Sequence, residues 1–179
     1  MALVTKFLPA LGDWPPEFCS LTQWTRVPPS FTVEYPAHTG PLSIKCTLEG
    51  EETCETEDGQ TFVVNANDYL VLNESERYAF CIDSLADVES FCIFYRLGLA
   101  EEVVSALNLS AETLLEDPTL RIDQHIQFFQ KLYPHGNMVT PQVQKFRSPI
   151  AENGAAEAEL EEHYHLLVES LLHNQIAIR

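Results

Sequence analysis

From Phe31 to Leu97 the chain alternates short runs of β-forming residues with turn residues. Within several of these runs apolar and polar side chains alternate, which is the pattern of strands with one buried face. The runs cover residues 31–35, 41–50, 51–57, 60–65, 68–73, 76–82 and 87–97. Short strands at this spacing are typical of a β-sandwich or a β-barrel. The pattern therefore predicts a mainly β domain over residues 31–97.

Local signals refine this prediction. Asp58-Gly59 separates two of the runs and predicts a two-residue hairpin turn, since glycine readily adopts a positive φ. In the run 41–50, Cys46 falls on the apolar face and Lys45 on the polar face, so we expect a half-buried strand. The last run is apolar on both faces near its middle, as expected for a strand that is covered on both sides.

Helical patterns replace the β pattern in the second half of the chain. Residues 99–108 place apolar side chains three or four positions apart, which predicts a helix, and a short turn is expected to start at Ser110. Residues 154–178 contain no proline and are rich in strong helix formers, which predicts one long helix. Between these segments prolines break the chain, and we expect a strand at 126–134 and a short helix at 141–148.

These patterns divide the chain into three segments. They are a proline- and tryptophan-rich arm over 1–30, the β region over 31–97 and a helical and mixed segment over 98–179. The arm should run extended because its prolines oppose helix formation, and Trp14 and Trp24 should pin it to the core. The predicted fold class is therefore mainly β (α+β), a β-barrel followed by C-terminal helices.

Charge limits the partners of the chain. Its 179 residues carry a formal net charge of −17, with 10 Lys and Arg against 27 Asp and Glu. Phosphate backbones and anionic lipids would be repelled, so we expect neither nucleic acid nor membrane as a direct partner. The apolar stretch at the N-terminus is too short for a signal peptide, and no apolar run approaches the roughly 18 residues of a membrane span. The five cysteines form no C-x-x-C pair, which favours reduced, mostly buried thiols and a cytoplasmic location.

Three candidate chemical sites have simpler interpretations. His163 and His165 lie two positions apart on a predicted helix and point to nearly opposite sides, so they cannot chelate one ion. Acidic and histidine residues recur every four positions along this helix, namely Glu161, His165, Glu169 and His173. A solvated polar face explains this pattern better than a zinc site does. The acidic run Glu49–Asp58 fits a hairpin with a wet edge better than a calcium loop. We therefore predict no metal, no cofactor and no catalytic residue.

Three stretches of the β region resemble the N-terminal sensor domain of AraC-family transcription regulators. They are SIKCTLEGEE at 43–52, NDYLVLN at 67–73 and RYAF at 77–80, and the later FFQKLYPH at 128–135 and helix HYHLLVESLLHNQIAIR at 163–179 also match that layout. The resemblance implies a cupin-like double-stranded β-helix barrel that binds a small effector. It also implies that the helices after the barrel form a dimer contact and lead to a pair of helix-turn-helix motifs.

The DNA-binding half of such a regulator is not in this sequence. The helical pattern continues to Arg179 without a glycine or proline stop, so we expect a truncated regulator that reaches DNA only through an absent C-terminal domain. Metal-dependent cupins carry histidines and a glutamate where this chain has Thr53–Thr56, and Tyr78 stands nearest the histidine of their second motif. A metal-centred oxygenase or isomerase is therefore disfavoured.

The predicted function is ligand sensing and dimerisation rather than catalysis. Strand parity places one set of side chains in the barrel interior as candidate effector-binding residues, namely Cys46, Tyr78, Phe80, Cys92 and Phe94. A one-residue error in register would turn these side chains outward. Two alternatives remain open, a stand-alone cupin-fold enzyme for a small molecule and a purely structural dimerisation module with a filled barrel.

The terminal helix is the candidate dimer contact. Its seam repeats at alternate spacings of four and three residues and consists of Leu160, Tyr164, Leu167, Leu171, Asn174 and Ile178. Such a seam fits a partner helix, with Asn174 setting the register, and would make the protein a homodimer. Leu166, Val168 and Leu172 widen the apolar stripe, so packing of this helix on its own chain is the alternative.

Overall fold

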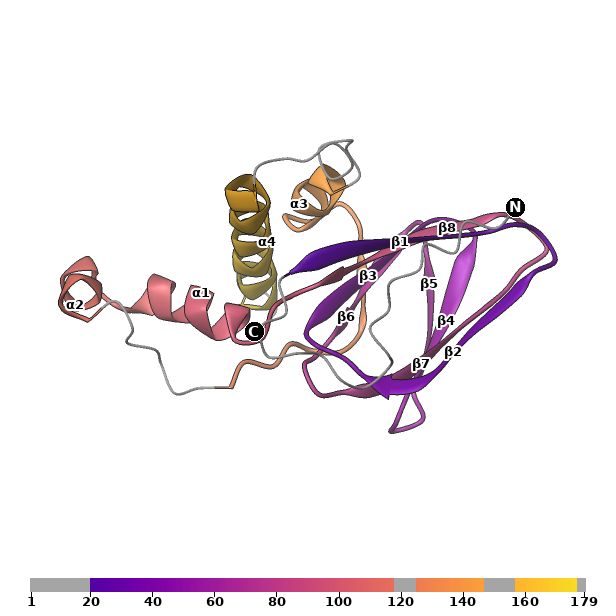
Figure 1. Ribbon diagram of the computed structural model, residues 1–179, viewed down its shortest axis with the longest axis horizontal. Helices are drawn as coiled ribbons and strands as arrows, with labels where there is room; N and C mark the ends of the chain where they lie inside the picture. Colours follow the sequence, from indigo (N-terminus) through magenta and orange to yellow (C-terminus); the bar gives the residue numbers. More distant parts are fainter. Residues whose placement is uncertain (1–19, 118–124, 147–156, 177–179) are drawn as a thin grey trace. The chain divides into compact units, whose positions relative to one another are not determined.

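The computed structural model describes residues 20–117, 125–146 and 157–176 (Figure 1). The chain divides into two compact units. The first consists of residues 1–96 together with 129–135, and the second of residues 97–128 together with 136–179. Trp14 of the predicted arm lies outside the described residues.

The first unit consists of two antiparallel sheets. Its strands are β1 (Leu21–Val27), β2 (Thr32–Thr39), β3 (Ser43–Glu49), β4 (Glu51–Thr56), β5 (Thr61–Asn65), β6 (Asp68–Leu72), β7 (Arg77–Asp83), β8 (Val88–Phe94) and β9 (Leu132–Pro134). One sheet has the order β1-β8-β3-β6-β9 and the other β2-β7-β4-β5. Strands that follow one another in the sequence often belong to different sheets, so the chain crosses repeatedly from one sheet to the other (Figure 1). The predicted fold class, mainly β with helices after the strands, is confirmed.

The core of this unit lies between the two sheets. Its main cluster takes side chains from both sheets, namely Cys54, Val64, Leu70, Leu72, Tyr78 and Phe80. A smaller cluster of Val27, Ile82 and Val88 also takes side chains from both sheets. Because the side chains of a strand alternate between its faces, every second residue of β3, β7 and β8 contributes to this interior.

Four local predictions need correction. The run 41–50, expected to be a half-buried strand, contains β3, which is buried on both faces from Ser43 to Thr47. The second half of the predicted arm is strand β1, which pairs with β8, and the Trp24 ring lies 4.9 Å from the Phe91 ring. The predicted strand 126–134 is reduced to β9. The hairpin between β4 and β5 is present, with Gly59 at φ 79°, but Thr56 N–H donates to the Gln60 carbonyl. The turn thus holds three residues inside that bond, which is a type I turn followed by a left-handed residue.

The second unit is helical. It contains α1 (Leu99–Asn108), α2 (Ala111–Glu116), α3 (Thr140–Lys145) and α4 (Glu157–Ile176), as the sequence predicts. The Ser110 side chain accepts a hydrogen bond from the Thr113 N–H and so caps α2, and a proline occupies the first turn of α3. Helix α4 packs against α1 and α3. None of the described helices is long and apolar enough to cross a membrane.

Candidate ligand-binding site

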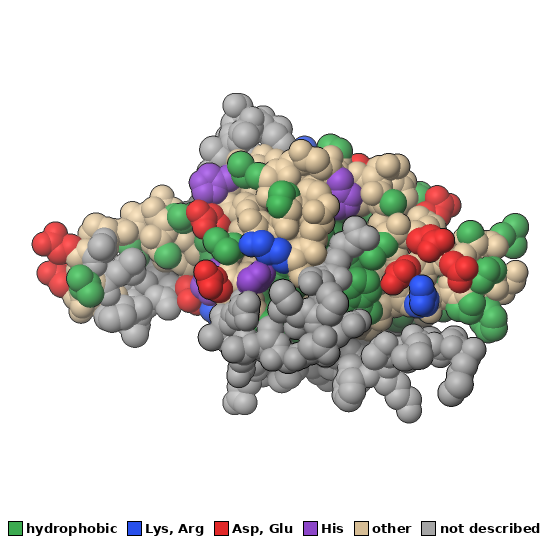
Figure 2. Space-filling model, turned by 90° about the horizontal axis from the view of Figure 1, so that it is seen from above, with side chains coloured by type: hydrophobic (Ala, Val, Ile, Leu, Met, Phe, Trp, Pro, Cys, Tyr) green, Lys and Arg blue, Asp and Glu red, His purple; other side chains and the backbone are tan. Residues whose placement is uncertain are grey.

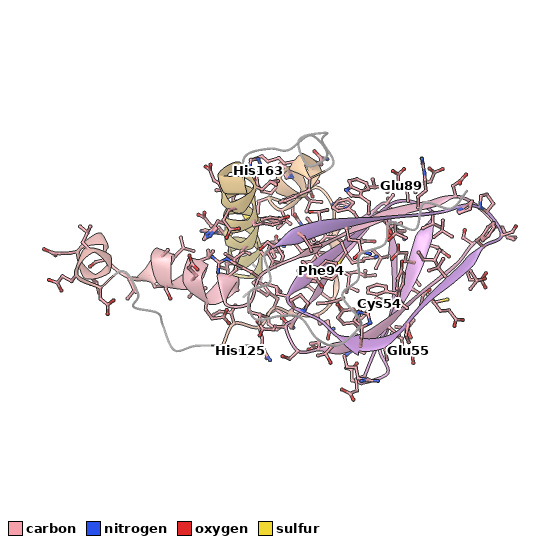
Figure 3. All side chains as sticks on the ribbon, in the orientation of Figure 1. Cys54, Glu55, Glu89, Phe94, His125 and His163 are labelled. Carbon is pink, nitrogen blue, oxygen red and sulfur yellow. The ribbon has the colours of Figure 1, made fainter. Side chains whose placement is uncertain are left out.

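A pocket opens between the two sheets of the first unit. It encloses about 380 Å³ including its open mouth. Its lining side chains are Gln23 and Thr25 of β1, Tyr35 and His38 of β2, Lys45 of β3, Tyr78 and Phe80 of β7, and Cys92 and Phe94 of β8. Phe94 and Cys54, labelled in Figure 3, come from opposite sheets.

Strand geometry explains why these side chains meet. Lys45 and Gln23 both pair with Cys92 in the sheet register, so the three side chains project from the same face of their sheet. On the other sheet, the register of β2 shifts between Tyr35 and His38. This irregularity lets two residues three positions apart face the same side.

Four of the five predicted ligand-binding residues come together in this pocket. Tyr78, Phe80, Cys92 and Phe94 line it, whereas Cys46 does not. Cys46 is fully buried, but its neighbour Lys45 takes the place facing the pocket. The prediction assumed that the apolar face of this strand points into the barrel, and the structure shows that its polar face does. Binding of a ligand by any of these residues stays a prediction.

A buried ion pair connects the sheets beside the pocket. The Nζ atom of Lys45 lies 2.8 Å from Oε2 of Glu52, and the Ser90 hydroxyl donates to Oε1 of the same carboxylate. The Lys45 and Glu52 side chains are 7% and 0% exposed. Gly50, at φ 74°, makes the turn between β3 and β4 that brings Glu52 back to Lys45. An added Cβ on Gly50 would lie 2.7 Å from a Val88 methyl group, so only glycine fits there.

Lys45 is kept in its charged form by its ion pair with Glu52. Burial by itself would lower its pKa, but attraction to Glu52, with smaller contributions from Cys92 and Tyr35, outweighs burial and raises the pKa. The ammonium group also lies 4.8 Å from the centre of the Phe80 ring, a cation–π distance. Lys45 is therefore a protonated hydrogen-bond donor at neutral pH.

Sequence reasoning missed both members of this pair. Lys45 was assigned to the polar, half-buried face of its strand, and Glu52 was assigned to a wet acidic edge. Glu52 is only 1% exposed, unlike its neighbour Glu51. The one available signal was a lysine within a strand that is otherwise rich in apolar residues.

Tyr78 supplies an aromatic wall and a hydroxyl group. Its ring meets the His38 ring edge-on at 4.7 Å and the Phe80 ring at 5.5 Å. The buried Tyr78 hydroxyl lies beside the buried Ser43 hydroxyl, although the two do not form a hydrogen bond of regular geometry. Burial raises the pKa of Tyr78, so the group stays protonated and can donate.

The thiols in this interior are poor nucleophiles. Burial raises the pKa of Cys92 to about 12, and the attraction of Lys45 offsets this only in part. Burial likewise raises the pKa of Cys54 to about 12. Because the thiolate is the reactive form, these cysteines act as small apolar side chains near neutral pH. The described cysteines of this unit are all free.

The predicted dimer seam is mostly buried within its own chain. Tyr164, Leu167 and Leu171 are 4%, 0% and 1% exposed, and the Tyr164 ring packs against the Phe146 ring at 5.0 Å. These three side chains are thus not free for a partner helix, which favours the alternative that α4 packs on its own chain. Leu160 and Asn174 are half-buried, and Ile178 lies outside the described residues.

The histidines of α4 have separate surroundings. His163 packs edge-on against Phe146 at 6.3 Å, while the His165 ring lies 3.6 Å from the Glu161 carboxylate. The described residues contain no group of three or more histidines, cysteines and acidic residues that could hold a metal ion.

The fold and the pocket define a class: mainly β proteins with a pocket between two antiparallel sheets. Comparison with known proteins finds no matching family model and no matching curated protein. Solved structures of ToxT from Vibrio cholerae do share the fold. The P21 crystal form has a TM-score of 0.53 and 9% identity, over 88% of this chain and 58% of ToxT.

Two further ToxT structures contain ligands. One is wild-type ToxT of strain SCE256 with an unsaturated fatty acid, at a TM-score of 0.54 and 8% identity over 87% of this chain and 55% of ToxT. The other holds (E)-4-(8-methylnaphthalen-1-yl)but-3-enoic acid, at a TM-score of 0.53 and 9% identity over 88% of this chain and 58% of ToxT. At these identities the likeness concerns the fold. The chain spans a little over half the length of ToxT.

Proposed function

We propose that this chain is the ligand-sensing domain of an AraC-type transcription regulator and that it binds a small effector between its two sheets. The observation that carries the proposal is the pocket itself, where a protonated Lys45 lies among aromatic walls. Apolar pockets with a few convergent polar groups are typical of small-molecule sites.

The ToxT likeness supports the same reading. ToxT is an AraC-family regulator, and two of its solved structures hold a small organic acid. The resemblance to AraC-type sensor domains comes from sequence motifs in the strands, whereas the likeness to ToxT comes from the fold. The two therefore support the proposal separately. Fold alone does not assign function, so the pocket and its chemistry remain the main support.

Binding fits the site better than catalysis. The thiols nearest the pocket have their pKa values raised to about 12, which leaves them protonated at neutral pH. The Lys45 amine is held in its charged form by Glu52 and so cannot act as a nucleophile. We therefore propose a binding module rather than a cupin-fold enzyme, located in the cytoplasm.

Contact with DNA is assigned to a part of the regulator outside this sequence. Figure 2 shows acidic side chains recurring over the visible face and few basic ones, in keeping with the net charge of −17. Such a surface repels a phosphate backbone. Homodimerisation stays a prediction, for which α4 offers the half-buried Leu160 and Asn174.

A ligand screen with a plugged-pocket variant tests the proposed function. The purified chain is screened by thermal shift against sugars, aromatic compounds, fatty acids and their amides, and hits are measured by calorimetry. A ligand that binds only the folded state raises the melting temperature with its concentration. Gln23→Trp places an indole at the half-buried mouth of the pocket and should abolish the response.

Arg26→Trp is the matched control for the plugged pocket. Arg26 lies on the same strand, its side chain is 68% exposed, and it faces away from the pocket. Hits that bind the wild type and Arg26→Trp but not Gln23→Trp support the proposal. Hits that bind all three proteins equally place the ligand elsewhere, and a complete lack of hits favours the structural module with a filled barrel.

A further inference from the structure

The charge balance of the pocket restricts what it can bind. Of the nine lining side chains, Lys45 alone carries a fixed charge, and this charge is already matched by Glu52 at 2.8 Å. Both oxygens of Glu52 are engaged, one by Lys45 and the other by the Ser90 hydroxyl. The pocket and its ion pair together are therefore electrically neutral, although the lining contains a cation.

A carboxylate ligand would disturb this balance. Its attraction to Lys45 would be opposed by the nearby Glu52 carboxylate, and the site would be left with one uncompensated negative charge. Removing a carboxylate from water is costly, and a pair that is already satisfied repays little of that cost. The buried Lys45–Glu52 pair thus works against anionic ligands.

A neutral acceptor meets no such opposition. An ammonium group has three N–H donors, so its ion pair with Glu52 leaves it able to donate to a second acceptor. A carbonyl oxygen in the pocket could accept a hydrogen bond from Lys45 without adding charge. The aromatic rings of Tyr35, Phe80 and Phe94 supply flat apolar walls for the rest of the ligand.

We propose that the pocket selects an uncharged aromatic ligand that presents a carbonyl-type acceptor to Lys45, and that it discriminates against the matching carboxylate. This inference rests on the proposed function, because it assumes that the pocket binds a small molecule. It differs in charge from the fatty acid and the butenoic acid that the ToxT structures hold.

Matched probe pairs test the proposal. Benzamide with benzoate and cinnamamide with cinnamate differ in charge but hardly in shape, and hexanamide with hexanoate lacks the ring. Calorimetry at pH 7 should show each aromatic amide binding about tenfold tighter or more than its carboxylate. Hexanamide should bind more weakly than the aromatic amides.

Glu52→Gln changes the charge of the site while keeping an acceptor for Ser90. In this variant Lys45 has no anionic partner, so the preference for the amide should disappear or reverse. Glu55→Gln is the matched control, because Glu55 lies on the same strand, is exposed and carries the same charge. It should keep the wild-type preference.

A second measurement covers the case in which Glu52→Gln does not fold. Calorimetry of benzoate in two buffers of different ionisation enthalpy reports protons taken up by the wild type. Uptake of about one proton per benzoate means that the neutral acid binds, as charge matching requires. Benzoate binding without proton uptake would overturn the proposal, as would carboxylates that bind as tightly as their amides.

The remaining outcomes separate this inference from the proposed function. If carboxylates bind more tightly than their amides but Gln23→Trp abolishes their binding, the proposed ligand class is wrong. The proposal of a sensor pocket is then still supported. If no aromatic amide binds while another class of compound binds in the screen, the inference again fails alone. If nothing binds to the folded protein in either experiment, both proposals fail.

Discussion

Removal of either member of the buried ion pair should destabilise the protein far more than removal of both. In Lys45→Met the Glu52 carboxylate stays buried without its cation, and in Glu52→Leu the ammonium group stays buried without its anion. Unit charges 2.8 Å apart attract by about 6 kcal/mol at an effective dielectric constant of about 20. Losing that attraction while desolvation remains should cost about 3–5 kcal/mol in each single variant.

The double variant should recover most of this loss. Lys45→Met with Glu52→Leu leaves no buried charge, so its free energy of unfolding should lie within about 2 kcal/mol of the wild type. The remaining deficit comes from the Ser90 hydroxyl, which loses its acceptor. The coupling energy of the double-mutant cycle should therefore be about 4 kcal/mol or more.

Urea denaturation at pH 7, followed by circular dichroism, measures the cycle. The exposed pair Arg26–Glu89, at 3.5 Å on the same sheet, is the internal control. Arg26→Met should cost less than about 1 kcal/mol, because solvent screens an exposed pair. Single variants of the buried pair that cost no more than Arg26→Met would refute the reasoning, as would a double variant that costs the sum of the singles.

The pH dependence follows from the same pair. Because the pKa of Lys45 is raised on folding, its contribution to stability is fully present below the unfolded value of about 10.4. It is lost as the pH rises through the higher folded pKa. Between pH 7 and 10 the pair's contribution should stay constant, and the difference between wild type and double variant should change only above that window.

Three further predictions concern the helix, the pocket wall and the thiols. Leu167→Asp should lower the free energy of unfolding by about 3 kcal/mol or more, since Leu167 is fully buried, whereas Leu160→Asp should not. Light scattering that shows a dimer lost in Leu160→Asp at unchanged stability would instead support self-association through α4. Gly40→Ala would place a Cβ 2.2 Å from the Tyr78 hydroxyl and should lower the melting temperature by the equivalent of about 1–3 kcal/mol. Tyr78→Phe should relieve part of that loss, and a Gly40→Ala protein of wild-type stability would contradict the contact. Iodoacetamide at pH 8, mapped by mass spectrometry, should modify buried Cys92, with its pKa of about 12, more slowly than half-buried Cys81. Equal rates at the two thiols would mean that Cys92 is open to solvent.

Local sequence signals determined the kinds of element and much of their placement. The alternating runs gave the strands of the β region, and Ser110 and the proline of α3 mark helix starts that the structure contains. The positive φ of Gly59 follows from its lack of a side chain. Such features depend on a few consecutive residues, so the chain pattern is sufficient to predict them.

Tertiary structure decided which face of each strand became the pocket. Cys46 and Lys45 are both buried, so hydrophobicity could not distinguish the interior face of β3 from the opposite one. The burial of Glu52 depends on the Gly50 turn and on Ser90, which is distant in sequence. Likewise, the spacing of the seam of α4 predicted a partner helix. Only the tertiary structure shows that Leu167 and Leu171 are buried within their own chain. A sequence shows which side chains are apolar enough to need burial. Which residues bury them depends on contacts between segments that are far apart along the chain.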